Sequence, residues 1–233
     1  MNAFTWDPKL SFSDVISFFA LLFSVLAIFC AQKSNRKMLQ YTEVQKRNEA
    51  EKLCNEALDL MSGGESGTKA LFIDFTKVAV DEESRYFERA RRNIEAALNL
   101  APNFYLCHQY FGLYTLKMDG SAVRERAEKA IPLYEKAVDL WKRDANPRVK
   151  DDGWPFHDLA VALSHSGDQA NAEKYYQEAL KINADTEPDF YADFAQFQLH
   201  VKKDARKCNE LYEIARKIAF AGHRKSNRPD LLN

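Results

Sequence analysis

A short pattern of residues recurs along this chain and limits the folds open to it. Ala172, Tyr176 and Ala179 lie at helical spacing, so they share one face of an amphipathic segment whose other face is charged. Similar copies begin at Ala50, Ala90, Ala130 and Cys208. The steps between successive copies are 40, 40, 42 and 36 residues.

This repetition predicts a solenoid of paired helices. A small residue, a bulky one four positions later and a second small one leave a notch where another helix can approach closely. Self-similarity at such a period is typical of stacked helical hairpins that bury one continuous core. Gly and Pro are scarce, at 8 and 7 residues, which suits long helices. We therefore expect an all-α fold.

Breaks in the pattern predict where the helices begin and end. Pro102, the Asp119-Gly120 pair and Gly167 each interrupt a helical segment, and Ser121 is placed to cap the next one. We read residues 62–67 as a turn and 144–153 as a loop. The expected helices of this part span residues 68–80, 84–100, 103–118, 121–143, 154–166, 168–182, 187–202 and 204–221.

Residues 15–32 carry no charged side chain. At ~1.5 Å of rise per residue this stretch measures about 27 Å, close to the ~30 Å hydrocarbon layer of a membrane. Trp6 suits one interface, and Lys33, Arg36 and Lys37 suit the other. We expect a transmembrane helix over residues 12–33. The excess of cations after it predicts an outside N-terminus and a cytoplasmic C-terminal domain.

Three other interpretations of this stretch fit less well. A cleaved signal peptide needs a basic start, but Asp7 and Asp14 offset Lys9, and Phe29 spoils a small-x-small cleavage site. A lipoprotein signal would place a small residue before Cys30, where Phe29 stands. A buried solenoid helix would be amphipathic, whereas this segment is apolar on every face.

The domain organisation follows from these signals. No Gly or Pro occurs between Lys9 and Ser62, so one helix could run from the membrane to Met61. The expected parts are a tail (1–11), the transmembrane helix (12–33), a stalk and capping helix (34–61), the repeat domain (62–221) and a basic tail (222–233). The stalk holds barely one heptad, so a coiled-coil dimer is only weakly indicated.

Charge is distributed unevenly around a formal net charge of −1. Lys plus Arg against Asp plus Glu count 7 to 5 in residues 1–52, 17 to 25 in 53–200 and 9 to 4 in 201–233. An acidic body argues against nucleic acid as a partner of the main surface. The basic C-terminal region could instead contact anionic lipid headgroups.

The four cysteines lie among apolar residues and form no CxxC pair. The simplest interpretation makes Cys30, Cys54, Cys107 and Cys208 small apolar filler that stays reduced.

One segment resembles a known repeat family. In residues 154–182, Phe156 stands where the tetratricopeptide repeat prefers Trp, and Leu159-Ala160 and Leu163 stand for its Leu-Gly and Tyr. Its second helix is matched by Ala172 and Tyr176. The resemblance extends over about residues 68–221 and implies helical hairpins that bind protein or peptide partners. The spacing here exceeds that family's ~34 residues and lies nearer that of HEAT-type repeats.

No motif for catalysis, metal or cofactor binding is present. HExxH, GxSxG and GxGxxG patterns are absent from the sequence. His157 and His165 lie about two helical turns apart, with no spaced cysteine or third histidine beside them. The pairs Glu82-Glu83 and Asp151-Asp152 fall at a helix start and a loop. We expect neither an enzyme nor a bound cofactor.

A stacked-hairpin solenoid presents a concave groove lined by the first helix of each pair. The residues expected to face this partner-binding groove are Tyr105, Gln109, Trp154, His157, Val161, Phe190, Asp193 and Phe197. Aromatic residues are also typical core filler, which is the competing interpretation for each of them. The set contains no Lys or Arg, which disfavours the cationic clamp that some tetratricopeptide domains use for acidic chaperone tails.

The sequence therefore favours a membrane-anchored, non-enzymatic scaffold or adaptor that binds a protein or peptide at the cytoplasmic face. The alternative is a structural subunit of a membrane complex or homo-oligomer that packs through its repeat faces. An enzyme with an unrecognised site is the third choice.

Overall fold

The computed structural model describes residues 12–61, 82–118, 121–183 and 186–226. Every regular element within those ranges is a helix, which confirms the expected all-α class there. The helices are α1 (Phe12–Met61), α2 (Glu82–Leu100), α3 (Tyr105–Met118), α4 (Val123–Arg143), α5 (Pro147–Lys150), α6 (Trp154–Ser166), α7 (Gln169–Ile182), α8 (Pro188–His200) and α9 (Ala205–Ser226).

The helix boundaries follow the predicted breaks within a few residues. α1 runs unbroken to Met61, as the absence of Gly and Pro allowed. Two details differ. The N-cap of α4 is Ala122, which makes no side-chain cap bond, so the prediction that Ser121 caps this helix is wrong. The expected loop 144–153 contains the one-turn helix α5. The turn at 62–67, the helix at 68–80 and the tail at 1–11 lie outside the described residues.

Gly167 makes the tight hairpin between α6 and α7. Its φ of 98° is in the left-handed region, which glycine adopts without steric cost. The amides of Gly167 and Asp168 both donate to the carbonyl of Leu163, which closes the end of α6. The Asp168 carboxylate then accepts from the amide of Asn171, 3.2 Å away, and caps α7.

The chain divides into two compact units, Met1–Lys46 and Arg47–Asn233. In the first unit, α1 exposes a run of large apolar side chains between Leu21 and Phe29. Across the described part of the chain, no helix combines the length and the apolarity that a membrane crossing requires. Residues 12–33 are helical, as expected, but the membrane span predicted there is not confirmed.

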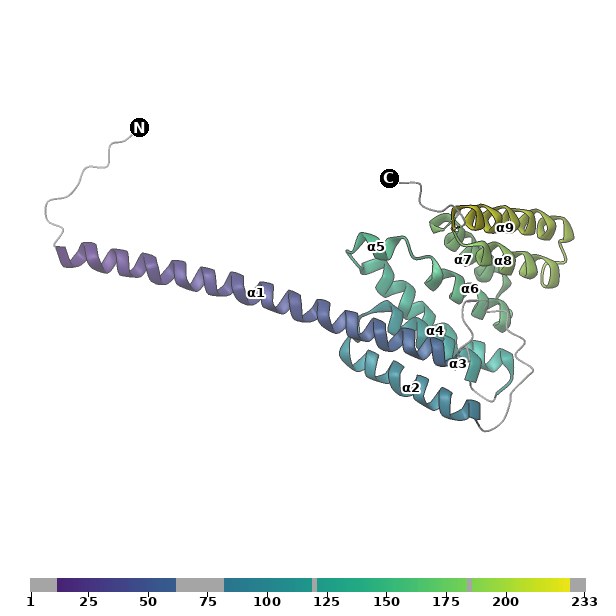
Figure 1. The fold of residues 1–233 in the computed structure, drawn as a ribbon, viewed down its shortest axis with the longest axis horizontal. Helices are drawn as coiled ribbons and strands as arrows, with labels where there is room; N and C mark the ends of the chain where they lie inside the picture. The colour runs from purple at the N-terminus through teal and green to yellow at the C-terminus, as the bar shows by residue number, and fades with distance from the viewer. Residues whose placement is uncertain (1–11, 62–81, 119–120, 184–185, 227–233) are drawn as a thin grey trace, which may run out of the picture. The chain divides into compact units, whose positions relative to one another are not determined.

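The second unit is a stack of paired helices that follow one another from teal to yellow in Figure 1. α3 packs on α4, α4 on α6, α6 on α7, and α8 on α9. The end of α1 joins α2 and α3 in one hydrophobic core cluster, and α4 to α9 supply most of a second. Trp141 and Trp154 pack against both clusters, so the two form one continuous core.

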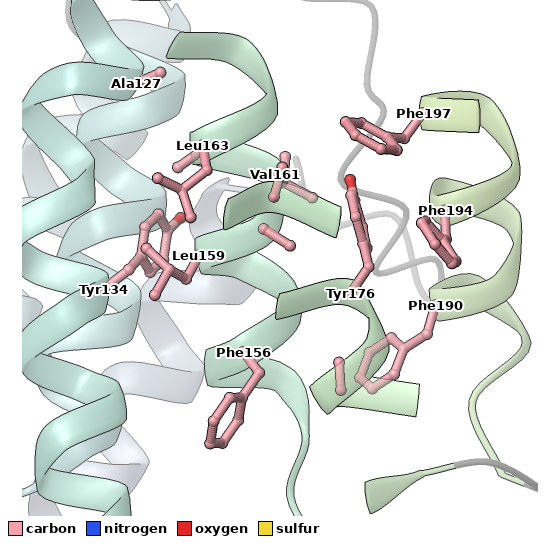
Figure 2. Close-up of a cluster of buried hydrophobic side chains, with 14 of the residues drawn as sticks. Ala127, Tyr134, Phe156, Leu159, Val161, Leu163, Tyr176, Phe190, Phe194 and Phe197 are labelled. Carbon is pink, nitrogen blue, oxygen red and sulfur yellow. The ribbon is translucent and has the colours of Figure 1, made fainter. Parts of the chain in front are cut away.

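The alanine notches point inward, as the repeat pattern predicted. Eight alanines of four copies are fully buried, namely Ala50, Ala57, Ala90, Ala97, Ala130, Ala137, Ala172 and Ala179. The bulky member of each copy lies between neighbouring helices. Figure 2 shows Tyr134 of α4 beside Leu159 of α6, and Tyr176 of α7 facing the aromatic residues of α8.

Gly112 of α3 lies directly against Tyr134 of α4. A Cβ atom at this position would lie 2.8 Å from the ring of Tyr134, which is itself fully buried. The ring therefore occupies the space that any other side chain at residue 112 would need.

Candidate functional site

Seven of the eight residues predicted to line the groove are buried. Tyr105, Gln109, His157, Val161, Phe190, Asp193 and Phe197 are all at most 6% exposed. Trp154 is the exception and keeps part of its surface accessible. The structure thus places the seven buried side chains inside the second unit. Phe190 stacks on His157, and Phe197 packs against Tyr176 of α7. Their contact with a partner stays a prediction.

A chain of polar side chains crosses three of these helices. The Gln109 amide on α3 donates to Oδ2 of Asp158 on α6 at 2.6 Å. The neighbouring His157 donates through Nδ1 to Oδ1 of Asp158 at 3.2 Å and through Nε2 to Oδ2 of Asp193 on α8 at 3.0 Å. All four residues are buried, so this chain ties α3, α6 and α8 together by directional bonds.

Aromatic rings enclose the histidine. The Phe190 ring stacks on the imidazole at a centroid distance of 4.7 Å and an interplanar angle of 10°. Trp154 and Tyr176 meet it edge to face at 5.2 Å and 5.9 Å. A cation stacked on aromatic faces is attracted by the ring quadrupole, so this enclosure suits a protonated imidazole.

The electrostatics of the site favour the imidazolium form. Burial by itself would lower the pKa of His157, but the hydrogen bonds to Asp158 and Asp193, together with their charges, raise it to about 9. Both ring nitrogens are bonded to carboxylates. Neither nitrogen is therefore left to take a proton from a nucleophile, so the geometry is that of a structural ion network.

Asp152 links the starts of α3 and α6 next to this chain. Its Oδ2 accepts from the Tyr105 hydroxyl at 2.6 Å, and its Oδ1 accepts from the amide of Trp154 at 3.0 Å. Burial and the charge of Asp152 raise the pKa of Tyr105, so the phenol stays protonated and keeps donating. This bond explains why a residue predicted to face the groove is buried.

The cysteines include a contact that sequence reasoning missed. Cys54 on α1 and Cys107 on α3 are fully buried, and their sulfur atoms lie 3.9 Å apart. Cys208 is also buried, while Cys30 is exposed. No cluster of three or more potential metal-ligating side chains occurs in the described residues.

Comparison with known proteins locates the repeat. Residues 122–185 match the family model described as Tetratricopeptide repeat. This range holds α4 to α7 and includes the segment on which the resemblance was predicted. A solved structure titled "MamA RS-1 ArsTM double mutant" has 16% identity and a TM-score of 0.47, covering 90% of this chain and 97% of that chain. No curated protein matches the chain.

The second unit exposes apolar side chains around its last hairpin. Leu199 on α8 and Tyr212, Ile214 and Phe220 on α9 are more than a third exposed. The basic residues of this region are partly neutralised, since Arg206 pairs with Glu210 at 3.2 Å and Lys202 with Glu173 at 2.8 Å. The exposed surface of this hairpin therefore mixes apolar side chains with charged ones, some of which are paired.

Proposed function

We propose that this chain is a membrane-tethered, non-enzymatic scaffold that binds a protein or peptide at the cytoplasmic face of a membrane. The helical-repeat unit is the binding module, and the apolar segment of α1 is the tether. A tether confines the search for a partner to a surface, which raises the effective concentration of the binding module.

The repeat architecture supports the proposed binding of a protein or peptide. Residues 122–185 match a family model for the tetratricopeptide repeat, and stacked helical hairpins of this kind suggest protein–protein interaction. His157, the buried histidine with a raised pKa, has both nitrogens engaged in hydrogen bonds that hold helices together. Its role in the fold accounts for its pKa, which supports a module that binds without catalysis.

The exposure of apolar side chains on α1 supports the proposed membrane tether. Seven large apolar residues are 45% to 67% exposed, namely Leu21, Leu22, Phe23, Val25, Leu26, Ile28 and Phe29. At about 100° of rotation per residue these side chains surround the helix, so one neighbouring protein helix could cover only some of them. Each Å² of apolar surface left in water costs about 25 cal/mol. A lipid environment covers every face at once.

Charge supports the orientation of the tether. Lys33, Arg36 and Lys37 follow the apolar run, and the positive-inside tendency favours the cytoplasm for that side. The repeat unit follows on the same side. The basic C-terminal region, which includes the exposed Lys203 and Lys217, is the part that we propose contacts anionic headgroups.

Membrane fractionation of the full chain tests the tether. We expect the protein to stay with the membrane pellet after an alkaline wash. The variant Leu22→Arg with Leu26→Arg should move to the supernatant, because each cation costs about 2.5–3.5 kcal/mol at the centre of a span. The control Met38→Arg with Tyr41→Arg changes two exposed side chains of the same helix beyond the run and should stay in the pellet. Release of the unmodified chain by the wash would contradict the tether.

Exposed residues at the end of α8 test the binding module. Leu199 and His200 are exposed, so the double variant Leu199→Glu with His200→Glu should leave the fold intact. It changes the surface at the end of α8, which is the first helix of the last pair. We expect partners captured by the detergent-extracted full chain to be lost in this variant. The control Lys136→Glu changes an exposed residue of the second helix α4 and should keep them. An identical partner set from both variants would remove this face from the proposal.

A structural subunit is the second candidate, and the exposed apolar residues of α9 favour it. Ile214 and Phe220 lie on a helix whose other face is already packed on α8, so a second copy or another subunit could cover them. Light scattering on the full chain in detergent separates the candidates. A stable oligomer that Phe220→Glu dissociates would favour the subunit, and a monomer at all concentrations would favour the scaffold.

A further inference from the structure

Cys54 and Cys107 are 53 residues apart in sequence and meet inside the second unit. Cys54 lies on the last turns of α1, between the buried notch residues Ala50 and Ala57. Cys107 lies on the first turns of α3. The Cys54 thiol donates to the sulfur of Cys107, at 3.9 Å between the sulfur atoms.

We propose that Cys54 and Cys107 form a redox-active dithiol whose oxidation to a disulfide fixes the end of α1 to α3. The inference is independent of the proposed membrane tether and partner. A disulfide has a sulfur–sulfur length of about 2.05 Å, so the two atoms must approach each other by about 2 Å. Rotation about χ1 of the two short side chains is the movement that such an approach requires.

The environment divides the two thiols into an attacking and a resolving group. The hydrogen bond between them raises the pKa of Cys54 and lowers that of Cys107, while burial raises the pKa of both. Cys107 accepts the hydrogen bond, so we assign it as the attacking sulfur and Cys54 as the resolving one. No third Cys, His, Asp or Glu joins them as a potential metal ligand among the described residues.

The reaction balances with a small-molecule disulfide as the oxidant. Both thiols are fully buried, so the contact must first open locally. The exposed Cys107 thiolate then attacks one sulfur of glutathione disulfide and releases the first glutathione thiolate. Cys54 loses its proton and attacks the Cys107 sulfur of the mixed disulfide, which releases the second glutathione. In sum, two protein thiols give up two electrons and two protons, and one glutathione disulfide becomes two glutathione thiols.

Peptide mapping of the full chain in detergent tests the bond. The variant Cys30→Ser removes the exposed thiol that would otherwise link copies. After equilibration with glutathione disulfide, remaining thiols are alkylated under denaturing conditions and the protein is digested. We expect a cross-linked pair of peptides holding Cys54 and Cys107, lighter by two hydrogens than the separate peptides. Alkylation of both cysteines, or glutathione on either without the cross-link, would overturn the proposal.

Thermal unfolding tests the consequence for α1. Closing a loop of this length should raise Tm by about 10 °C, and dithiothreitol should reverse the rise. Cys208→Ser is the matched control, because Cys208 is buried without a cysteine beside it and its loss should leave the redox-dependent shift in place. Cys107→Ser should abolish the shift. If the disulfide forms but Tm does not rise, the proposal that it fixes the end of α1 to α3 is overturned.

Discussion

The Nε2 atom of His157 lies 3.0 Å from Oδ2 of Asp193, and this bond joins α6 to α8 inside the protein. On its other side the same imidazole contacts Asp158, which Gln109 of α3 also holds. One protonated ring thus bridges two carboxylates from different helix pairs. The stack of hairpins is therefore held by charge as well as by apolar packing, and its stability must depend on the protonation of this ring.

The first prediction concerns pH. The pKa of His157 is about 9 in the folded protein and close to 6.5 when unfolded, so the folded state holds the proton more tightly. The stabilisation is complete below pH 6.5 and is lost as the pH rises through 9. At 1.36 kcal/mol for each pKa unit, the loss is about 3 kcal/mol. Urea unfolding of the full chain between pH 6 and pH 9 measures it.

Asp193→Asn is the matched control for that prediction. The amide keeps the shape of the carboxylate but removes its charge, so the pKa of His157 falls and the slope of stability against pH flattens. A steep slope that persists in this variant would assign the pH dependence to other groups. A flat profile in the unmodified protein would contradict the ion network itself.

The second prediction concerns the contact between Gly112 and Tyr134. Gly112→Ala places a methyl group 2.8 Å from a buried ring and should cost about 1–3 kcal/mol of unfolding free energy. Combining it with Tyr134→Leu frees the space, so the double variant should lose less than the sum of the two single ones. Chemical denaturation of the three variants provides the double-mutant cycle. Strict additivity would show that the ring does not limit residue 112.

The third prediction compares two buried tyrosines. The Tyr176 hydroxyl has no hydrogen-bond partner among the residues that the structure describes, so Tyr176→Phe should be neutral or stabilise by up to about 1 kcal/mol. The Tyr105 hydroxyl donates to a carboxylate at 2.6 Å, so Tyr105→Phe should cost about 1.5–3 kcal/mol. Thermal melts rank the two variants. The reverse order would contradict both assignments.

The helical framework could be predicted because its signals are local. Each of these signals acts within a few residues of its own position, namely Gly167, Pro102 and the small–bulky–small copies. Helices end near Pro102 and Gly167 as predicted, and the alanines of the copies are buried. The N-cap of α4 could not be predicted in this way. Ser121 is a good capping residue by type, but the helix begins two residues later.

The candidate site was harder to predict because its partners come from distant helices. His157 was assigned to the groove by its offset along α6, and nothing near it in sequence indicates that Asp193 on α8 meets its imidazole. The contact of Cys54 with Cys107 was missed for the same reason. A usable signal did exist for the contact of α3 with α4, since Gly112 is a helical glycine opposite the bulky Tyr134.

Site-specific photo-cross-linking in native membranes tests the central claim. The claim is that the repeat unit is tethered to a membrane and binds a protein at the surface next to the first helices of its pairs, α3, α6 and α8. A photoreactive residue at His200, exposed at the end of α8, is compared with one at Lys136, exposed on α4. The account predicts a discrete adduct with another protein from position 200, recovered in the membrane fraction, and none from position 136. Equal adducts from both positions, or an adduct only with a second copy of this chain, would contradict it.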